Sequence, residues 1–563
     1  MRKMGLPREW AGMLFFGLVG VSIFALFGCS AQSYRKGADK EVYGIIAAKQ
    51  REVFGEERPF SIEHEMPSAP EEVIPSPDSQ PSGAPAPEAP VISLADALAI
   101  AFVNNRDYQS QEEDVYVQAL RLSLERHLFA PIFSGGLSGE AVRTSSDTSG
   151  SATADLGVSK LFAAGGRLTV NLTTALSQFF TGDPRRAASS LASMAFVQPL
   201  LRGAGRLETQ ENLTQAERNV VYQLRSFLRF QQSFVVNVVS EYFRVLERTN
   251  IVDNEWRNYQ DLLETTRRSE MLAAAGRIPE FQVDQARQNE LRARNRWVLA
   301  VEAYEGALDR FKIRLGVPMG QALQLDSEEL VRLAEKGLTQ PELSVEEAAA
   351  LALEKRPDLM NVRGQVEDAR RKVSIAERHL QGEASIVLGA DISTVGASKP
   401  LNFNLDKGGT YSGGLALDLP LERTAERNSY RESLISLERA KRGMTLSADT
   451  VQLDVRDAYR GLKQTRESYE IQKRSVELAE RRVDSTNLLL QAGRAQTRDL
   501  LEAQTALVEA RNALTTATVD HTIARLQFFR DVGVLEVQEN APLESLSGEA
   551  LPSGNERDKE NGL

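Results

Sequence analysis

An internal repeat constrains this 563-residue chain more than any other feature, because a duplicated unit imposes the same order of elements twice. The string Glu-Arg-His-Leu occurs at 125–128 and again at 377–380. Ala-Gly-Arg occurs at 275–277 and at 492–494, and at the same offset of 217 Phe311 matches Phe528. These matches define a first repeat over 92–320 and a second repeat over 344–535.

Each repeat predicts four elements in one order. A helix of about 37 residues begins after a serine that can cap it, and a region of strands follows. A very long helix then runs to the Gly-Arg break, and a last helix follows the break. The expected ranges are 94–130 and 345–381 for the first helix, 132–201 and 384–421 for the strands, 207–275 and 423–492 for the long helix, and 278–315 and 495–532 for the last helix.

Apolar residues recur every seven positions in the long helices, as at Phe227 and Phe234 and at Leu437, Met444 and Val451. Sustained heptads favour coiled-coil packing, although an ordinary antiparallel bundle gives the same pattern. A helix of this length spans roughly 100 Å at 1.5 Å per residue. The two shorter helices of a repeat sum to nearly the same length, so we expect a tall helical wall.

The strand regions alternate apolar and polar residues, most clearly over 167–173, 385–391 and 411–419. Such alternation suits a membrane barrel whose other face lines water, and a soluble hairpin sheet gives a similar pattern. Residues 160–174, with a turn at 164–166, predict an additional hairpin in the first repeat. The sequence leaves open whether this hairpin joins the barrel or folds outside it, and with it the number of strands per protomer.

The N-terminus predicts an export signal. Basic residues at positions 2, 3 and 8 precede an apolar run, and residues 1–29 end at Leu26-Phe27-Gly28-Cys29. This resembles the bacterial lipobox, so we expect an acyl lipid on Cys29, the only cysteine. The alternative is an uncleaved signal anchor. Residues 30–91 are expected to form a polar and proline-rich linker, 321–343 an equatorial segment between the repeats, and 536–563 a disordered tail.

Composition argues against several functions. The net charge of -11 disfavours a nucleic-acid binder, which would show a basic stripe. The four histidines are scattered along the sequence and the chain has a single cysteine, so no cluster of metal ligands is apparent. We therefore expect no metal site and no cofactor. No nucleophile triad, phosphate loop or zinc-protease motif is present, so we expect a protein that is not an enzyme.

The order of helix, strands, long helix, Gly-Arg break and helix, given twice behind a lipobox, resembles the outer membrane efflux protein family of the TolC type, in its lipoprotein subgroup. The resemblance covers roughly 92–535 and is most specific at 198–200, 275–277 and 491–503. It implies an α+β membrane protein whose repeats form a trimeric outer-membrane β-barrel continued by a periplasmic α-helical tunnel. A membrane-fusion adaptor and an inner-membrane transporter would be its partners, and its function would be export.

The resemblance also assigns site residues. Asp499 and Glu502 match acidic positions near the periplasmic mouth and share one helix face, so a trimer would carry two anionic rings there. The corresponding residues of the first repeat are Gln282 and Gln285. Arg494 is a candidate for closing the mouth by pairing across helices. The tips that would meet the adaptor contain Gly276, Arg277, Gly493 and Arg494.

The main alternative is a periplasmic coiled-coil scaffold or adaptor lipoprotein without a pore. Adaptors carry one helical hairpin between compact β domains, whereas this chain has two hairpins with the strands inside each repeat. The sequence does not identify the exported substrate or the type of pump.

Overall fold

The computed structural model describes residues 30–63, 91–145, 148–181, 186–336, 343–394, 401, 403, 409–419 and 421–537. Its contacts divide the chain into two compact units. The first comprises Met1–Ser61, Asp114–Val221 and Gly382–Leu419, and the second comprises the remainder. The units therefore cut across the repeats, since strands from both repeats lie in the first unit. Cys29, Pro420 and residues 538–563 lie outside the described ranges.

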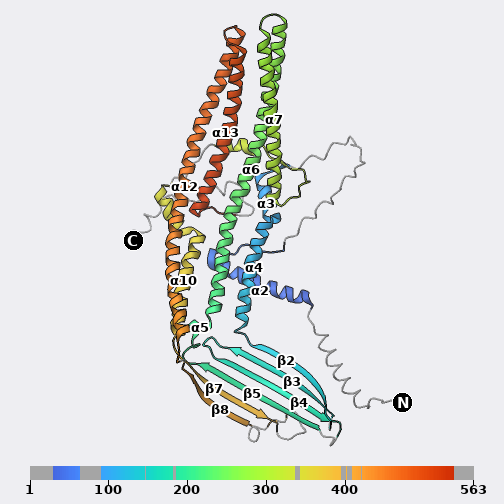
Figure 1. Ribbon diagram of the computed structural model, residues 1–563, viewed down its shortest axis with the longest axis vertical. Helices are drawn as coiled ribbons and strands as arrows, with labels where there is room; N and C mark the ends of the chain where they lie inside the picture. Colours follow the sequence, from blue (N-terminus) through green and yellow to red (C-terminus); the bar gives the residue numbers. More distant parts are fainter. Residues whose placement is uncertain are drawn as a thin grey trace, which may run out of the picture. The chain divides into compact units, whose positions relative to one another are not determined.

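The first unit contains one six-stranded antiparallel sheet, in the order β2-β3-β4-β5-β7-β8 (Figure 1). The predicted extra hairpin corresponds to β3–β4, and it lies within the sheet. Among the described residues, β2 and β8 are the edge strands. The bounds are β2 Ile132–Arg143, β3 Thr148–Leu161, β4 Arg167–Phe179, β5 Arg186–Pro199, β7 Glu383–Ser393 and β8 Gly409–Asp418.

The pairing registers sort the side chains of this sheet onto two faces, because directly opposed residues share a face and the face alternates along each strand. One face, here named the apolar face, carries Phe133, Leu137, Leu156, Val158, Val170, Leu172, Met194, Phe196, Ile386, Leu388, Tyr411 and Leu415. The other, the polar face, carries Ser134, Ser138, Asp155, Thr169, Asn171, Thr173, Ser193, Asp391, Thr410 and Ser412, with a few apolar exceptions such as Val387.

A helix precedes the first repeat. Residues 31–54, which the sequence analysis assigned to the linker, form α2 (Ala31–Phe54). Within the first unit Tyr116 donates a hydrogen bond to Asp39 and its ring contacts that of Tyr43. The expected linker is corrected here because Val42, Ile45 and Ile46 follow helical spacing and are buried.

The helices of the second unit include two long hairpins, α6–α7 and α12–α13 (Figure 1). The long and last helices of both repeats appear within a few residues of their expected bounds. Phe227 and Phe234, from the predicted heptad row, are buried beside Tyr108. Across both units, the bounds of these and the other helices of the repeats are α3 Leu94–Asn104, α4 Arg106–His127, α5 Arg206–Thr209, α6 Glu211–Ala274, α7 Glu280–Leu315, α9 Val345–Lys355, α10 Pro357–Arg378, α12 Thr424–Gln491 and α13 Thr497–Val532.

The first helix of each repeat is broken, which corrects the prediction of one continuous helix of about 37 residues. The breaks fall at Asn105 and Arg356, whose ψ angles of 124° and 121° are extended. Arg356 precedes a proline, which disfavours helical backbone at that residue. Asn105 accepts a hydrogen bond from the backbone N–H of Tyr108 at 2.9 Å and so caps α4.

Between the repeats lie β6 (Gln324–Leu325) and α8 (Glu328–Lys336). Strand β6 pairs in parallel with β1 (Val91–Ile92), the strand that precedes the first repeat. The hydroxyl of Tyr242 on α6 donates to the carbonyl of Ile92 at 3.2 Å. Both ends of the first repeat are therefore fastened to each other and to its long helix. Of the helices in the described ranges, none is both long and apolar enough to cross a membrane.

Candidate functional site: the two hairpin tips

The tips of the two hairpins have the same backbone. At the first, Gly276 N–H bonds to the carbonyl of Ala273 at 2.8 Å and Arg277 N–H to that of Leu272 at 2.9 Å. At the second, Gly493 and Arg494 make the equivalent bonds at 3.0 and 2.8 Å. Each pair of bonds satisfies carbonyl groups that the end of the long helix would leave unpaired. The predicted helix stop at each Gly-Arg is thus confirmed in atomic detail.

Backbone conformation explains the glycine at each tip. Gly276 and Gly493 both have a φ of 69°, the left-handed region in which a β-carbon is strained. A β-carbon added at either position would meet no atom within 4 Å. Conformation and not crowding therefore requires glycine, and the space around both tips is open within this chain.

The two tip arginines are exposed to solvent. Within the described residues, neither Arg277 nor Arg494 has a side-chain hydrogen bond or ion pair. The expected pairing of Arg494 across helices is thus not made inside one chain, and it stays a prediction for a contact with another copy. Open guanidinium groups at the tips leave the adaptor-facing role of Arg277 and Arg494 physically accessible.

Asp499 begins α13 as a helix cap. Its carboxylate accepts the backbone N–H of Gln496 at 3.0 Å, and the Gln496 side chain in turn accepts the N–H of Asp499. This reciprocal arrangement is a capping box. The residue that the resemblance assigns to an anionic ring therefore also holds the start of its own helix.

Glu502 is exposed and lies beside Arg498, with the guanidinium Nε 3.6 Å from its carboxylate. Both side chains are more than half exposed, so this pair is screened by water and contributes little to stability. Asp499 and Glu502 lie on the first turns of one helix, as predicted. The positive charge of Arg498 therefore stands next to the carboxylate of Glu502.

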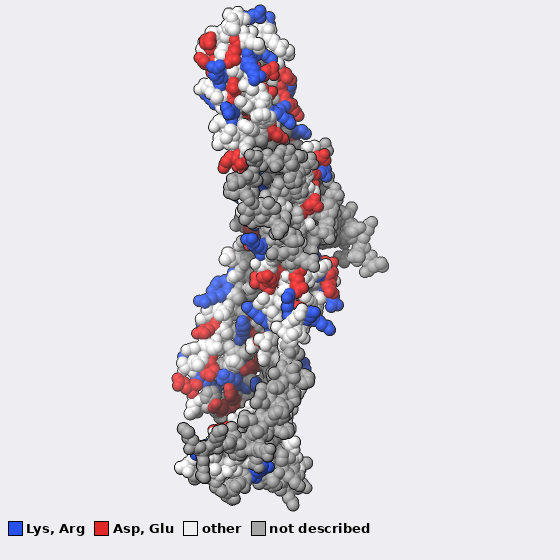
Figure 2. Space-filling view, turned by 90° about the vertical axis from the view of Figure 1, so that its right-hand side faces the viewer, with Lys and Arg blue, Asp and Glu red and all other residues white. Residues whose placement is uncertain are grey.

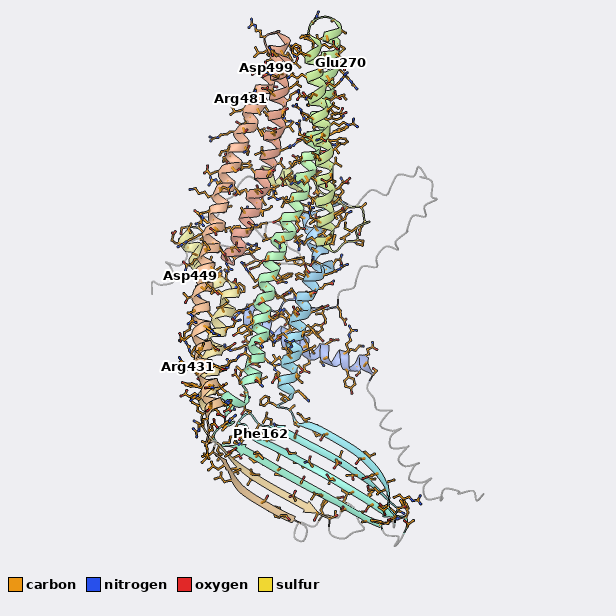
Figure 3. All side chains as sticks on the ribbon, in the orientation of Figure 1. Phe162, Glu270, Arg431, Asp449, Arg481 and Asp499 are labelled. Carbon is orange, nitrogen blue, oxygen red and sulfur yellow. The ribbon has the colours of Figure 1, made fainter. Side chains whose placement is uncertain are left out.

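The first tip has a different chemistry at the same backbone positions. Gln282 and Gln285 replace the two acids, and Pro279 takes the cap position without a side-chain hydrogen bond. An ion pair joins the hairpin near this tip, with Arg287 on α7 2.6 Å from Glu270 on α6. Figure 3 marks Glu270 and Asp499 near the two tips. Acidic and basic residues are interspersed over the tip region on the face seen in Figure 2.

A row of polar side chains joins α6 to α13 below the tips, and the sequence analysis missed it. Thr516 donates to Glu247 at 2.6 Å, Thr515 to Asn250 at 3.0 Å, and the amides of Asn254 and Asn512 bond at 2.9 Å. We name these residues, together with Glu255, Arg244 and Asp520, the polar seam. Glu and Asn at helical spacing on α6 were the available signal. Their partners lie more than 250 residues away, so no local pattern identifies them.

His521 on α13 has a large pKa shift. It is 2% exposed, and its Nδ1 lies 3.3 Å from the hydroxyl of Thr465 on α12. Burial, and then the positive charges of Arg525 and Arg466, lower the pKa of His521 to about 4. The imidazole is therefore neutral at pH 7 and serves as a core residue of the α12–α13 hairpin.

No group of three or more potential ligands in the described ranges could hold a metal ion. The lipidation site predicted at Cys29 lies outside those ranges, so lipid attachment there stays a prediction.

Comparisons with known proteins place the fold. Residues 348–533 match the family described as outer membrane efflux protein, which confirms the resemblance found in the sequence. The sequence matches none of the curated proteins. Among solved structures, CusC is 14% identical with a TM-score of 0.58, covering 81% of this chain and 99% of CusC.

Two further outer-membrane proteins have the same fold. The Campylobacter jejuni CmeC outer membrane channel is 14% identical with a TM-score of 0.58, and the match covers 81% of this chain and 89% of CmeC. VceC, an outer membrane protein of Vibrio cholerae, is 12% identical with a TM-score of 0.56, covering 78% of this chain and 96% of VceC.

Proposed function

We propose, from the outer membrane efflux protein family to which residues 348–533 belong, that this chain is the outer-membrane exit duct of a tripartite efflux or type I secretion system. Three copies would close the sheets into one barrel. The helical hairpins would reach through the periplasm to a membrane-fusion adaptor and an inner-membrane transporter. An acyl lipid on Cys29 would anchor each copy to the outer membrane.

One observation carries the proposal. The apolar face of the sheet is exposed in the single chain, with Phe133 77% and Leu137 71% accessible. A soluble protein rarely exposes so continuous an apolar surface. The edge strands β2 and β8 also present unpaired backbone groups, which lipid does not tolerate. Lipid would cover the apolar face, and further copies of the chain would pair with both edge strands.

The proposal is tested on the full chain purified from outer membranes. We expect a trimer that survives mild detergent, dissociates on heating, and conducts ions in planar bilayers. A monomer that gives no conductance would contradict the duct and favour the scaffold alternative.

The anionic mouth is tested separately. We expect Asp499→Ala combined with Glu502→Ala to reduce cation over anion selectivity, since carboxylate rings favour cations. Gln282→Ala combined with Gln285→Ala changes the matching positions of the first tip and is the control, because it removes no charge. Equal selectivity of the acidic double variant and the unchanged protein would remove the rings from the proposal.

A further inference from the structure

The hairpin β3–β4 is the main difference between the strand regions of the two repeats. The second repeat contributes β7 and β8, whereas the first contributes four strands. Strand β3 pairs with β2 from Ile132↔Ser159 to Arg143↔Thr148, and β4 pairs with β5 from Arg167↔Val197 to Gln178↔Arg186. The hairpin is therefore inserted in the middle of the sheet, and it is not an appendage at an edge.

The turn of this hairpin is fixed to the rest of the unit. Figure 3 marks Phe162 where the turn begins, and its N–H bonds to the carbonyl of Gly166 at 2.8 Å. The carbonyl of Ala164 accepts the N–H of Gly205 at 3.0 Å, which ties the turn to the segment after β5. At Gly165, with a φ of 95°, a β-carbon would lie 2.5 Å from the carbonyl oxygen of Gly203. Close backbone packing thus holds the turn in place.

The side chains of the hairpin obey the same two-face rule as the other strands. Val158 lies opposite both Phe133 and Val170 on the apolar face. Asp155 lies on the polar face, where it accepts a hydrogen bond from Thr173 at 2.7 Å. A hairpin folded over a pore or away from lipid would have no need of a continuous apolar face that matches its neighbours.

The lengths of the two strands also fit a membrane crossing. Strands β3 and β4 have 14 and 13 residues, and a tilted membrane strand needs roughly 9–11. Both strands are at least as long as β7, which has 11 residues. The hairpin therefore reaches as far as the strands of the second repeat.

We propose that β3 and β4 cross the outer membrane beside the other four strands, so that three copies close a barrel of eighteen strands around a wide, water-filled exit. The proposal rests on the trimeric duct proposed above. Barrels of roughly 16–18 strands leave an aqueous channel, and diameter grows about linearly with strand number. The exit would then pass bulky polar solutes, and selection by size would occur elsewhere along the duct.

Single cysteines test where the hairpin lies. Asn171→Cys on the polar face and Val170→Cys on the apolar face of β4 are compared in liposomes, with Val387→Cys and Leu388→Cys on β7 as the matched pair. We expect a water-soluble maleimide to label positions 171 and 387 at least about tenfold faster than 170 and 388. The unchanged chain, with Cys29 alone, gives the background.

Three outcomes separate this inference from the proposed function. Fast labelling on the polar face and slow labelling on the apolar face of both β4 and β7 supports the eighteen-stranded barrel. If the labelling rate differs between the two positions on β7 but not between those on β4, the inference is wrong and the proposed exit duct still stands. Equal labelling throughout contradicts the membrane barrel itself, and the inference with it.

Deletion of residues 148–181 gives an independent measurement of width. Removing both strands leaves β2 and β5 antiparallel, so the smaller barrel can still close. We expect the largest polyethylene glycol that enters from the extracellular side to fall to about two-thirds of its former diameter. An unchanged cutoff would overturn the proposal. Should the deleted chain fail to insert, the cysteine comparison on the full chain decides.

Discussion

At the tip between α6 and α7 the backbone turns at Gly276, and at the tip between α12 and α13 it turns at Gly493 with the same φ of 69°. Side chains at matching positions, 217 residues apart, nevertheless differ. Leu501, Asp499 and His521 stand where the first repeat has Asp284, Gln282 and Tyr304. In the second hairpin, Leu501 and His521 are buried side chains and Asp499 adds a negative charge. Duplicated backbone geometry thus persists while the side chains of the two copies serve different structural tasks.

The largest expected difference lies at Leu501. Its side chain is 2% exposed and packs with Leu262 and Ala293, whereas Asp284 is exposed. We expect Leu501→Ala to lower the free energy of unfolding of the hairpin by about 2–5 kcal/mol, because it leaves a cavity. Asp284→Ala should change it by less than about 0.5 kcal/mol. Hydrogen exchange of the α13 and α7 amides measures both changes, and similar losses for the two variants would show that positions 284 and 501 do not differ in packing.

The next difference is the response to acid. The folded pKa of His521 is about 4 against an ordinary value of 6.5, so the unfolded chain binds more protons between these pH values. Stability from neutral His521 is complete above pH 6.5 and is lost as the pH falls toward 4. The loss reaches about 3 kcal/mol.

Tyr304 does not titrate in that range, since burial raises its pKa further above neutrality. We therefore expect α13, and not α7, to exchange its amide hydrogens faster as the pH falls from 7 to 4, after correction for the intrinsic exchange rate. The variant His521→Phe should remove this dependence. Equal acid sensitivity of the two hairpins, or dependence that survives the substitution, would show that another group is responsible.

The smallest difference concerns the start of α13. Asp499→Ala removes the acceptor for the N–H of Gln496, and we expect a cost of about 1 kcal/mol in local stability. Gln282→Ala, at a position where no equivalent cap exists, should cost a few tenths at most. Hydrogen exchange of the backbone amides at 496–500 and 279–283 measures the local stability of each helix start. A cost at position 282 that matches the cost at 499 would contradict the cap.

Local signals explain which features the sequence could predict. The helix stop at each Gly-Arg and the alternation along β4 are each set by a few neighbouring residues, so both were predicted. The break before Pro357 was not predicted, although the proline is a local signal for it. At the break at Asn105, the side-chain amide donates a hydrogen bond to the carbonyl of Arg314 at 2.7 Å, a partner far along the chain that no local pattern identifies. Strand order and the polar seam depend likewise on distant partners. The position of β3–β4 inside the sheet therefore required the three-dimensional structure.

The polar seam has a mechanical consequence. Its hydrogen bonds join successive turns of α6 and α13 at several levels, from Arg244 with Asp520 to Asn254 with Asn512. Axial translation of one helix past the other would break all of them at once, whereas bending above the seam would break none. Sliding of α6 along α13 is therefore opposed by several hydrogen bonds at once, and nearer the tips the buried cluster of Leu262, Ala293 and Leu501 continues the packing between the helices.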